Sequence, residues 1–322
     1  MIGYYYMITY QKLFNNPAKL LRFTGLNIFQ FQVLSSRLKP LWEKEEEKRL
    51  SRKNRIRAIG GGRKYHLSTI EDKLLLILVF YRTYCIYEIL GWMFNLNPSN
   101  VCRMIKKLIP LVEKAADPSL RLALKTIRHK KKRLGFEEFI RTYPDIVELV
   151  IDSTEQKRRR PKNKRKQKNF YSGKKHHHGL KTQIIVSRCG KIISVSKTYP
   201  ARVHDKTVLL KEKTLDKIPK EIKILLDKGY KKIEKIYPTH RIVIPIKRNR
   251  FKKILERKEK IKNTKLAKKR VIVEHTICHL KKYQILSQVY RSKEEDYNQH
   301  FRNIAALYNF KLNFKQISLN LN

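Results

Sequence analysis

Cysteine is scarce in this sequence of 322 residues, and the four that occur are scattered along it. None of them stands in a C-x-x-C pair, which argues against both a disulfide framework and a zinc ribbon. So few cysteines are typical of a protein of the reducing cytoplasm. The four are Cys85, Cys102, Cys189 and Cys278.

Long apolar runs are missing as well. The longest, Leu74 to Tyr81, is far shorter than the roughly 20 residues that a helix needs to span a bilayer. The N-terminus, MIGYYYMITYQKL, lacks the charged start and the long apolar core of a signal peptide. We therefore expect a soluble, intracellular protein.

Acidic residues are few, with 27 Asp and Glu against 75 Lys and Arg, so the formal net charge is +48. Such a chain is expected to bind polyanions, because each phosphate that a Lys or Arg neutralises releases condensed counterions. Hydrophobic residues make up 41% and aromatic residues 10%, which indicates a globular protein and excludes a disordered basic tail. Composition alone leaves open a ribosomal or chromatin protein, or a merely solvated Lys-rich surface.

Four segments can be separated along the chain. Residues 1–60 have apolar spacing suited to short helices, and the run GGGR after Ile59 indicates a flexible joint. Residues 61–120 are predicted to be helical, and residues 121–144 form a basic linker that contains LKTIRHKKKRLGF. Residues 145–322 switch to strand patterns and are predicted to form a separate α/β domain.

The second segment matches a helix-turn-helix. A helix is predicted from about Ile86 to Phe94, followed by a tight turn and a second helix with Asn97 as N-cap and Pro98 at its first position. Periodicity alone favours an ordinary small helical bundle over a DNA-binding helix-turn-helix. The high positive charge of the chain weakens this preference for the bundle. The second helix would offer an exposed face to a major groove. That face consists of Ser99, Asn100, Arg103 and Lys107.

The fourth segment contains five short runs rich in β-branched residues: IVELVID, TQIIVSR, KIISVSK, IKILLD and RIVIPIK. Cys189-Gly190 alone separates the second run from the third, which predicts a hairpin. Helix-like stretches follow the hairpin, in HDKTVLLKEKTL, and the last strand, over Lys265–Lys282. This order predicts a mixed α/β sheet, with a final helix from Asp296 to Asn322 covering it.

Three acidic residues stand at the edges of apolar stretches. Asp152 and Asp227 each end a predicted strand, and Glu274 lies on the helix that follows the last strand. Ligands gather at the carboxyl ends of central strands in open α/β sheets. Carboxylate oxygens suit Mg²⁺ or Mn²⁺, and two such ions would support an in-line displacement at phosphorus. Singly, each residue is better explained as a surface carboxylate, but together they predict a nuclease-like metal site.

Several motifs resemble the DDE transposases of insertion sequences related to the PIF/Harbinger elements, over nearly the whole chain. The family signature of Arg, three residues, Glu, six residues and Lys is present as Arg270, Glu274 and Lys281, and the motif DKGY starts at Asp227. FYSGKKHHHGLKTQIIV, PARVHDKTVL, LLRFTGLNIFQF and GGGRKYHLSTIEDKLLLIL resemble further blocks of the family. One departure is Ala267, where relatives often have a Tyr; it removes no metal ligand.

The resemblance implies an RNase H-like catalytic domain in which Asp152, Asp227 and Glu274 bind two Mg²⁺ or Mn²⁺ ions. Water would hydrolyse the phosphodiester at the transposon end, and the freed 3′-hydroxyl would attack target DNA. Arg270 and Lys281 share a helix face with Glu274 and would hold phosphates. The implied partners are double-stranded DNA and further copies of the chain in the DNA complex, within a prokaryotic cytoplasm at the nucleoid.

The most basic stretch, QKRRRPKNKRKQKNFYSGKKHHH, follows Asp152 directly. A charge run is usually a solvated loop. Beside a metal site we expect it to line the path of the DNA as well. The phosphate-binding candidates in it are Arg158, Arg159, Arg160, Lys174 and Lys175.

Alternatives remain for the site and for the function. Asp205 competes for the role of second ligand, but at the start of a helix a carboxylate can simply bind exposed N–H groups. Asp227 is preferred because it ends an apolar strand and carries the family motif. The main functional alternative is a transposase-derived DNA-binding protein without turnover. An RNA- or ribosome-associated protein would explain the charge but not the carboxylates.

Overall fold

The computed structural model describes residues 7–51, 65–118, 120, 146–248 and 254–320. The run GGGR and the basic linker 121–144 lie outside these residues. The chain divides into two compact units. The helical unit consists of residues 1–118, 282–286 and 299–322, and the sheet unit consists of residues 119–281 and 287–298.

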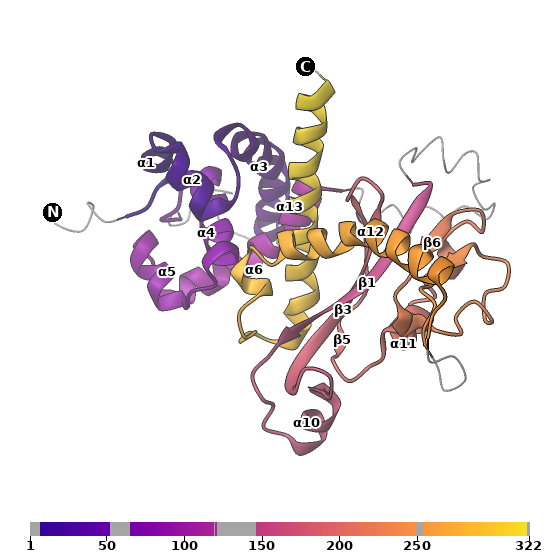
Figure 1. Cartoon of the computed structure of the whole chain (residues 1–322). Coiled ribbons are helices and arrows are strands. Elements are labelled where there is room, and N and C mark those ends of the chain that lie inside the picture. Colours follow the sequence, from indigo (N-terminus) through magenta and orange to yellow (C-terminus); the bar gives the residue numbers. More distant parts are fainter. Residues whose placement is uncertain (1–6, 52–64, 119, 121–145, 249–253, 321–322) are drawn as a thin grey trace. The chain divides into compact units, whose positions relative to one another are not determined.

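The helical unit contains helices throughout its described length (Figure 1). Their bounds are α1 Tyr10–Phe14, α2 Pro17–Thr24, α3 Ile28–Leu50, α4 Ile70–Thr83, α5 Tyr87–Phe94, α6 Pro98–Ala116 and α13 Glu294–Asn320, whose first turn belongs to the sheet unit. None of the helices within the described residues is long and apolar enough to cross a membrane.

The helices α4, α5 and α6 confirm the helical prediction for the second segment. Thr69 caps α4 by accepting a hydrogen bond from the amide of Asp72 at 3.1 Å. Asn97 caps α6 by accepting one from the amide of Ser99 at 2.9 Å, and Pro98 occupies the first turn. The side chains of α4 from Leu74 to Tyr81 are all buried, so the longest apolar run is a core helix.

The helix α3 is longer than the short helices that the sequence predicts. A capping box between Asn27 and Gln30 starts it, and it continues through Pro40. Its buried side chains, Phe31, Leu34, Leu38 and Trp42, keep helical spacing across the proline. The packing of this face therefore outweighs the hydrogen bond that the proline removes.

The C-terminal helix also differs from expectation, because most of α13 belongs to the helical unit rather than to the sheet. Asn303 donates to the hydroxyl of Tyr81 at 2.7 Å and to the carbonyl of Ile109 at 2.8 Å. Arg302 forms an ion pair of 2.6 Å with the fully buried Glu113. These polar contacts specify helices α4 and α6 as the neighbours of α13.

The sheet unit confirms the predicted mixed α/β architecture. The strand order is β2-β3-β1-β6-β7, and β4 and β5 also pair with β3. The central strand β1 runs antiparallel to β3 and parallel to β6, which is parallel to β7. The strands are β1 Glu148–Lys157, β2 Tyr171–Ser172, β3 His177–Ser187, β4 Ile192–Val195, β5 Tyr199–Pro200, β6 Lys223–Leu225 and β7 Ile242–Val243.

Helices accompany the sheet at α10 Lys164–Phe170, α11 Asp205–Lys211 and α12 Arg257–Leu280. The predicted hairpin is present as β3–β4, with Gly190 at φ +86° in the turn, where glycine is favoured. The helix α12 begins eight residues earlier than the sequence predicts, because Glu256 and Glu259 form a capping box.

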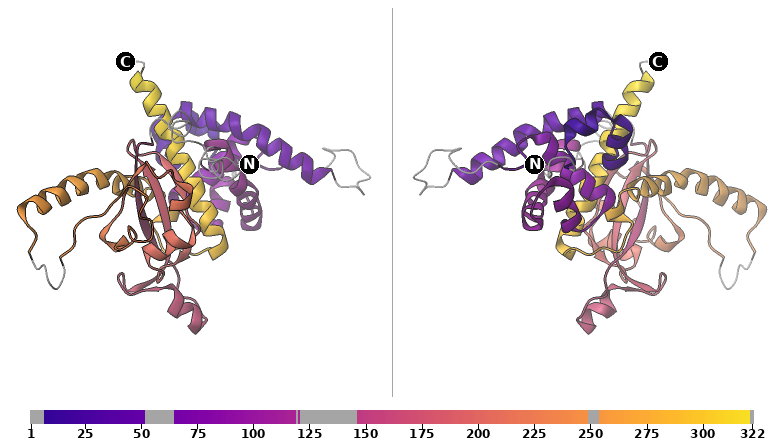
Figure 2. Two further views of the ribbon diagram at one scale, coloured as in Figure 1. Left: turned by 90° about the vertical axis from the view of Figure 1, so that its right-hand side faces the viewer. Right: turned by 90° about the vertical axis from the view of Figure 1, so that its left-hand side faces the viewer.

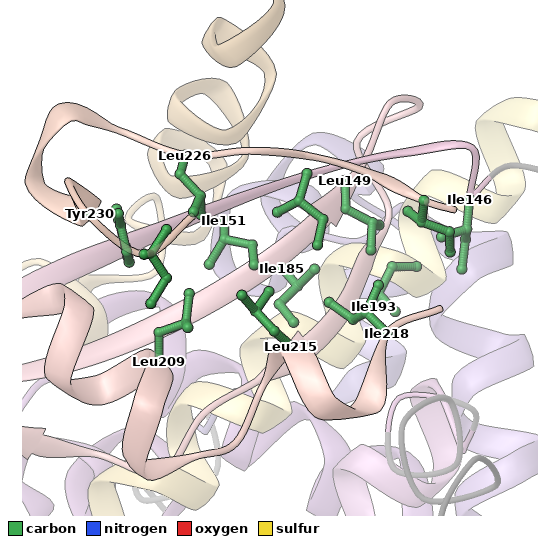
Figure 3. Packing of buried hydrophobic residues seen from close by; sticks show 13 residues of the cluster. Ile146, Leu149, Ile151, Ile185, Ile193, Leu209, Leu215, Ile218, Leu226 and Tyr230 are labelled. Atoms are coloured by element: carbon green, nitrogen blue, oxygen red, sulfur yellow. The ribbon is translucent and has the colours of Figure 1, made fainter. Parts of the chain in front are cut away.

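The two faces of the sheet are covered by different helices. Figure 3 shows Leu149, Ile151 and Ile185 packed in one cluster with Leu209 of α11 and with Tyr230. Side chains alternate along a strand, so the neighbours of Leu149 and Ile151 on β1 point to the other face. That face meets α12, which packs against β1 and β3 (Figure 1).

Candidate active site and nucleic-acid interface

Asp152 and Asp227 stand level with each other on neighbouring strands. The parallel pairing of β1 and β6 ends at Val150 and Leu225, and each aspartate lies two residues further on. Strand alternation puts the carboxylate of Asp152 on the face that α12 covers, away from the apolar cluster around Ile151. The ion pair with Arg270 of α12 places Asp227 on the same face. The fold therefore brings these two predicted site residues together.

One detail of the prediction needs correction, because Asp152 lies inside β1 rather than at its end. The strand continues to Lys157, where it still pairs with Gly179 of β3. Only the parallel pairing with β6 stops before Asp152. The aspartate thus marks the carboxyl end of the parallel part of the sheet, where ligands commonly bind in such folds.

Arg270 of α12 provides a positive charge next to Asp227, on the face of the sheet that α12 covers. Its Nη1 lies 3.0 Å from Oδ1 of Asp227, and the residue is only 9% exposed. Its Nε is buried and has no hydrogen-bond partner among the described residues. The sequence predicts Arg270 as a phosphate ligand; in this structure its guanidinium is paired with a candidate metal ligand instead.

Burial raises the pKa of Asp152 to about 6, and the nearby carboxylates of Asp227 and Asp205 raise this pKa further. The amide of Ser153, which donates to Oδ1 at 2.8 Å, and the charge of Arg270 lower the pKa of Asp152. A half-buried carboxyl among other carboxylates gains most from a bound cation. The oxygen donors of Asp152 and Asp227 therefore fit a hard divalent ion.

Glu274 lies one helical turn after Arg270 on α12, and its side chain is exposed. Within the described residues, no three His, Cys, Asp or Glu side chains are close enough to hold one metal ion. The structure thus gathers two of the three predicted ligands. The third is on the helix that covers the same face.

Asp205, the rival ligand, is paired with a lysine on the opposite face of the sheet. It starts α11 and forms an ion pair of 2.9 Å with Lys181 of β3. Lys181 also lies 3.3 Å from Glu155, its cross-strand partner on β1. Glu155 is three residues after Asp152, so its side chain points to the other side of the sheet. Lys181 therefore pairs with both carboxylates, while the charge of Asp205 still raises the pKa of Asp152.

Sequence reasoning did not single out the polar network beneath Asp227. Gln183 donates to the hydroxyl of Tyr230 at 2.7 Å, and Ser153 lies 3.3 Å from the same oxygen. The amide of Tyr230 also donates to the carbonyl of Asp227 at 3.0 Å, closing a tight turn. Tyr230 is the last residue of the DKGY motif, so the motif itself could have pointed to this tyrosine. The role of Tyr230 is to anchor the loop that carries Asp227.

Some of the predicted phosphate-binding side chains are exposed, whereas Arg158 and Lys281 are partly buried. The guanidinium of Arg158 lies over the ring of Phe170 at 4.2 Å and forms an ion pair of 2.8 Å with Glu294. Lys281, the C-cap of α12, is half-buried, and burial lowers the pKa of its ammonium group. The exposed members of the predicted set are Arg159, Arg160, Lys174 and Lys175.

Three of the four predicted DNA-recognition residues of α6 are exposed, and the fourth is partly buried. Ser99, Asn100 and Arg103 are exposed, and Arg103 donates to the side chain of Asn100 at 2.7 Å. Lys107 is partly buried, and its ammonium lies 3.0 Å from Glu46 of α3 and also contacts the hydroxyl of Tyr65. The first three residues are thus open to a ligand, and Lys107 holds α6 to α3.

Comparison with known proteins agrees with this architecture. Residues 151–309 match the family described as DDE superfamily endonuclease, and residues 65–118 match the helix-turn-helix of DDE superfamily endonuclease. A probable transposase for insertion sequence element IS702 of Microchaete diplosiphon is 32% identical over 247 residues, which are 76% of this chain and 82% of that protein. No solved structure matches the chain significantly. The chain belongs to the DDE superfamily of insertion-sequence transposases, with a helix-turn-helix region ahead of an endonuclease domain of mixed α/β fold.

Proposed function

We propose that this transposase binds the terminal inverted repeats of its own element and catalyses phosphodiester hydrolysis and strand transfer there. Asp152, Asp227 and Glu274 are the proposed catalytic carboxylates and ligands of two Mg²⁺ or Mn²⁺ ions. The observation that carries this proposal is the level placement of Asp152 and Asp227 on the α12 face of the sheet. The working form is expected to be a homo-oligomer on DNA.

Residues of the chain would support this reaction in three ways: by binding the metal ions, by balancing charge and by positioning Asp227. Bound divalent ions would activate the attacking oxygen and stabilise the leaving oxygen of an in-line displacement. Asp152 must be deprotonated for this, and its pKa of about 6 leaves it mostly ionised at neutral pH. Arg270 balances the charge of Asp227 before DNA and metal arrive, and Tyr230 anchors the turn that presents this aspartate.

End recognition is assigned to α6. Ser99, Asn100 and Arg103 lie at the exposed start of this helix, where a helix-turn-helix reads base edges. Arg159, Arg160, Lys174 and Lys175 are proposed to contact the phosphates of the end, because they are exposed in the sheet unit. Contacts of this kind position the duplex and carry no sequence information.

The test is Mg²⁺-dependent nicking of a duplex that carries the end of the element, with a scrambled duplex as reference. The full-length protein is expected to nick the end duplex, and Asp152→Asn is expected to bind it with unchanged affinity but not to nick it. Nicking by Asp152→Asn at the rate of the unmodified protein would refute the assignment of the site.

A second candidate function is DNA binding without turnover, favoured because Glu274 is exposed and no three carboxylates among the described residues are close enough to hold one metal ion. It predicts tight and specific binding of the end duplex, with no nicking in Mg²⁺ or Mn²⁺. The nicking assay therefore separates the two functions directly.

A further inference from the structure

The first half of α12 is an unusually basic stretch that no part of the proposed site uses. We call residues 257–269 the basic arm. It contains one acidic residue, Glu259, and seven basic ones: Arg257, Lys258, Lys260, Lys262, Lys265, Lys268 and Lys269. All seven basic side chains are exposed.

The basic arm is ordered although little of it is buried. Figure 2 shows the start of α12 extending away from the sheet. The capping box of Glu256 and Glu259 closes its first turn. Asn263 clamps the arm to the chain after β7, because it donates to the carbonyl of Ile246 and accepts from its amide, each at 2.9 Å. The first buried side chain of the helix is Leu266.

The charges of the basic arm repel one another along the helix. Lys258, Lys262, Lys265 and Lys269 follow at intervals of four, three and four residues, so they form one stripe. Like charges at these spacings destabilise a helix. Lys269 lies 3.4 Å from Glu148, whereas no ion pair joins the other three to a carboxylate among the described residues. The arm is therefore complementary to an external polyanion.

We propose that the basic arm binds the phosphate backbone of duplex DNA, as a contact site separate from α6 and from the stretch after Asp152. The inference rests on the proposed function for the identity of the polyanion. Lys258 to Lys269 spans about 16 Å at about 1.5 Å per residue, which matches roughly five phosphates of one strand along the axis of the duplex. Arg270 and Glu274 continue the same helix, so DNA held by the arm runs toward the carboxylates.

The proposal is tested by the salt dependence of DNA binding by the full-length protein. Each phosphate contact adds about 0.9 to the slope of log K against log salt. The triple variant Lys258→Gln/Lys262→Gln/Lys265→Gln is expected to lose about 2.7 of that slope. Glutamine keeps the helix propensity, and the charge-preserving triple Lys→Arg variant is expected to keep the slope.

The matched control is Lys211→Gln/Lys213→Gln/Lys220→Gln, which removes the same charge from exposed positions at or after α11. This control is expected to change the slope by less than about 1. Equal losses in the two variants, or no loss in the arm variant, would overturn the proposal. Because phosphate contacts carry no sequence information, the loss must be the same on end and scrambled duplexes. Absence of DNA binding by the unmodified protein would instead overturn the proposed function.

Discussion

Two groups of carboxylates lie on opposite faces of the same sheet, and their surroundings differ. Asp205 and Glu155 share Lys181, whose side chain is 7% exposed, so one buried cation pairs with both carboxylates. Asp152 and Asp227 share Arg270, and the Asp227 side chain is still 46% exposed. Each group contains two carboxylates and one cation, but the side chains of Glu155 and Asp205 are 15% and 32% exposed, so Asp227 is the carboxylate most open to an incoming cation. The direction of a side chain on β1 or β3 decides which group it joins.

The largest expected effect is on cleavage. Replacing Asp227 by Asn should reduce nicking of the end duplex by about 10³-fold, because metal-borne charge stabilisation is worth several kcal/mol. Asp205→Asn should change nicking by less than about tenfold, since Asp205 faces Lys181 rather than α12. Initial nicking rates of the two variants, measured at equal DNA occupancy, check the comparison. The reverse order would make Asp205 the second ligand.

Substitution in the cluster of Lys181, Glu155 and Asp205 should lower the stability of the fold rather than the rate of cleavage. Lys181→Met leaves Glu155 and Asp205 without their shared cation and should lower the free energy of unfolding by about 3 kcal/mol, as for other broken buried pairs. Lys269→Met breaks an exposed contact with Glu148 and should cost less than about 1 kcal/mol. Urea unfolding of the two variants measures the difference. Equal costs would show that Lys181 is not the central cation of its face.

The pH dependence of the free energy of unfolding should distinguish Asp152 from the carboxylates that pair with Lys181. The pKa of Asp152 is about 6 in the folded protein and near 3.8 when unfolded, so the folded state binds more protons between these values. The contribution of Asp152 to stability is therefore present below pH 4 and is lost as pH rises through 6, by about 3 kcal/mol in all. Asp152→Asn should remove this slope in unfolding experiments between pH 4 and 7. A slope retained in that variant would assign the titration to another group.

The smallest effect expected is on metal affinity without DNA. Arg270→Gln removes the guanidinium that pairs with Asp227, so Mn²⁺ should bind about tenfold more tightly to the DNA-free protein, a change of about 1.4 kcal/mol. The same substitution should raise the pKa of Asp152 above about 6, because the charge of Arg270 lowers it. Calorimetric titration with Mn²⁺ tests the first effect. Weaker binding in the variant would mean that Arg270 orients Asp227 for the ion rather than competing with it.

Much of the fold was predictable from local signals. Thr69, Asn97 and Pro98 start helices where capping chemistry requires it, and Gly190 marks the hairpin between two β-branched runs. Errors arose where distant packing overrides local preference. Pro40 lies inside α3 because one buried face continues past it, and α13 joins α4 and α6 through Asn303 and Arg302.

The candidate site was predictable in part. Asp152 and Asp227 follow apolar strands, and the fold brings them level because β1 and β6 are parallel neighbours. The partners of these residues were not predictable. The pairing of Arg270 with Asp227 and of Lys181 with Asp205 joins residues 43 and 24 positions apart, and no local pattern encodes such contacts.

Residue types and short-range spacing are enough to identify the kind of protein, a basic α/β chain with helix caps, strands and DDE motifs. The folded sheet establishes which carboxylates share a face and which cations are already paired. It also shows that the helix with seven basic residues extends away from the sheet. Those outcomes depend on strand register and side-chain direction. A shift of one residue in register reverses the face of every side chain on a strand, so only the paired sheet can settle them.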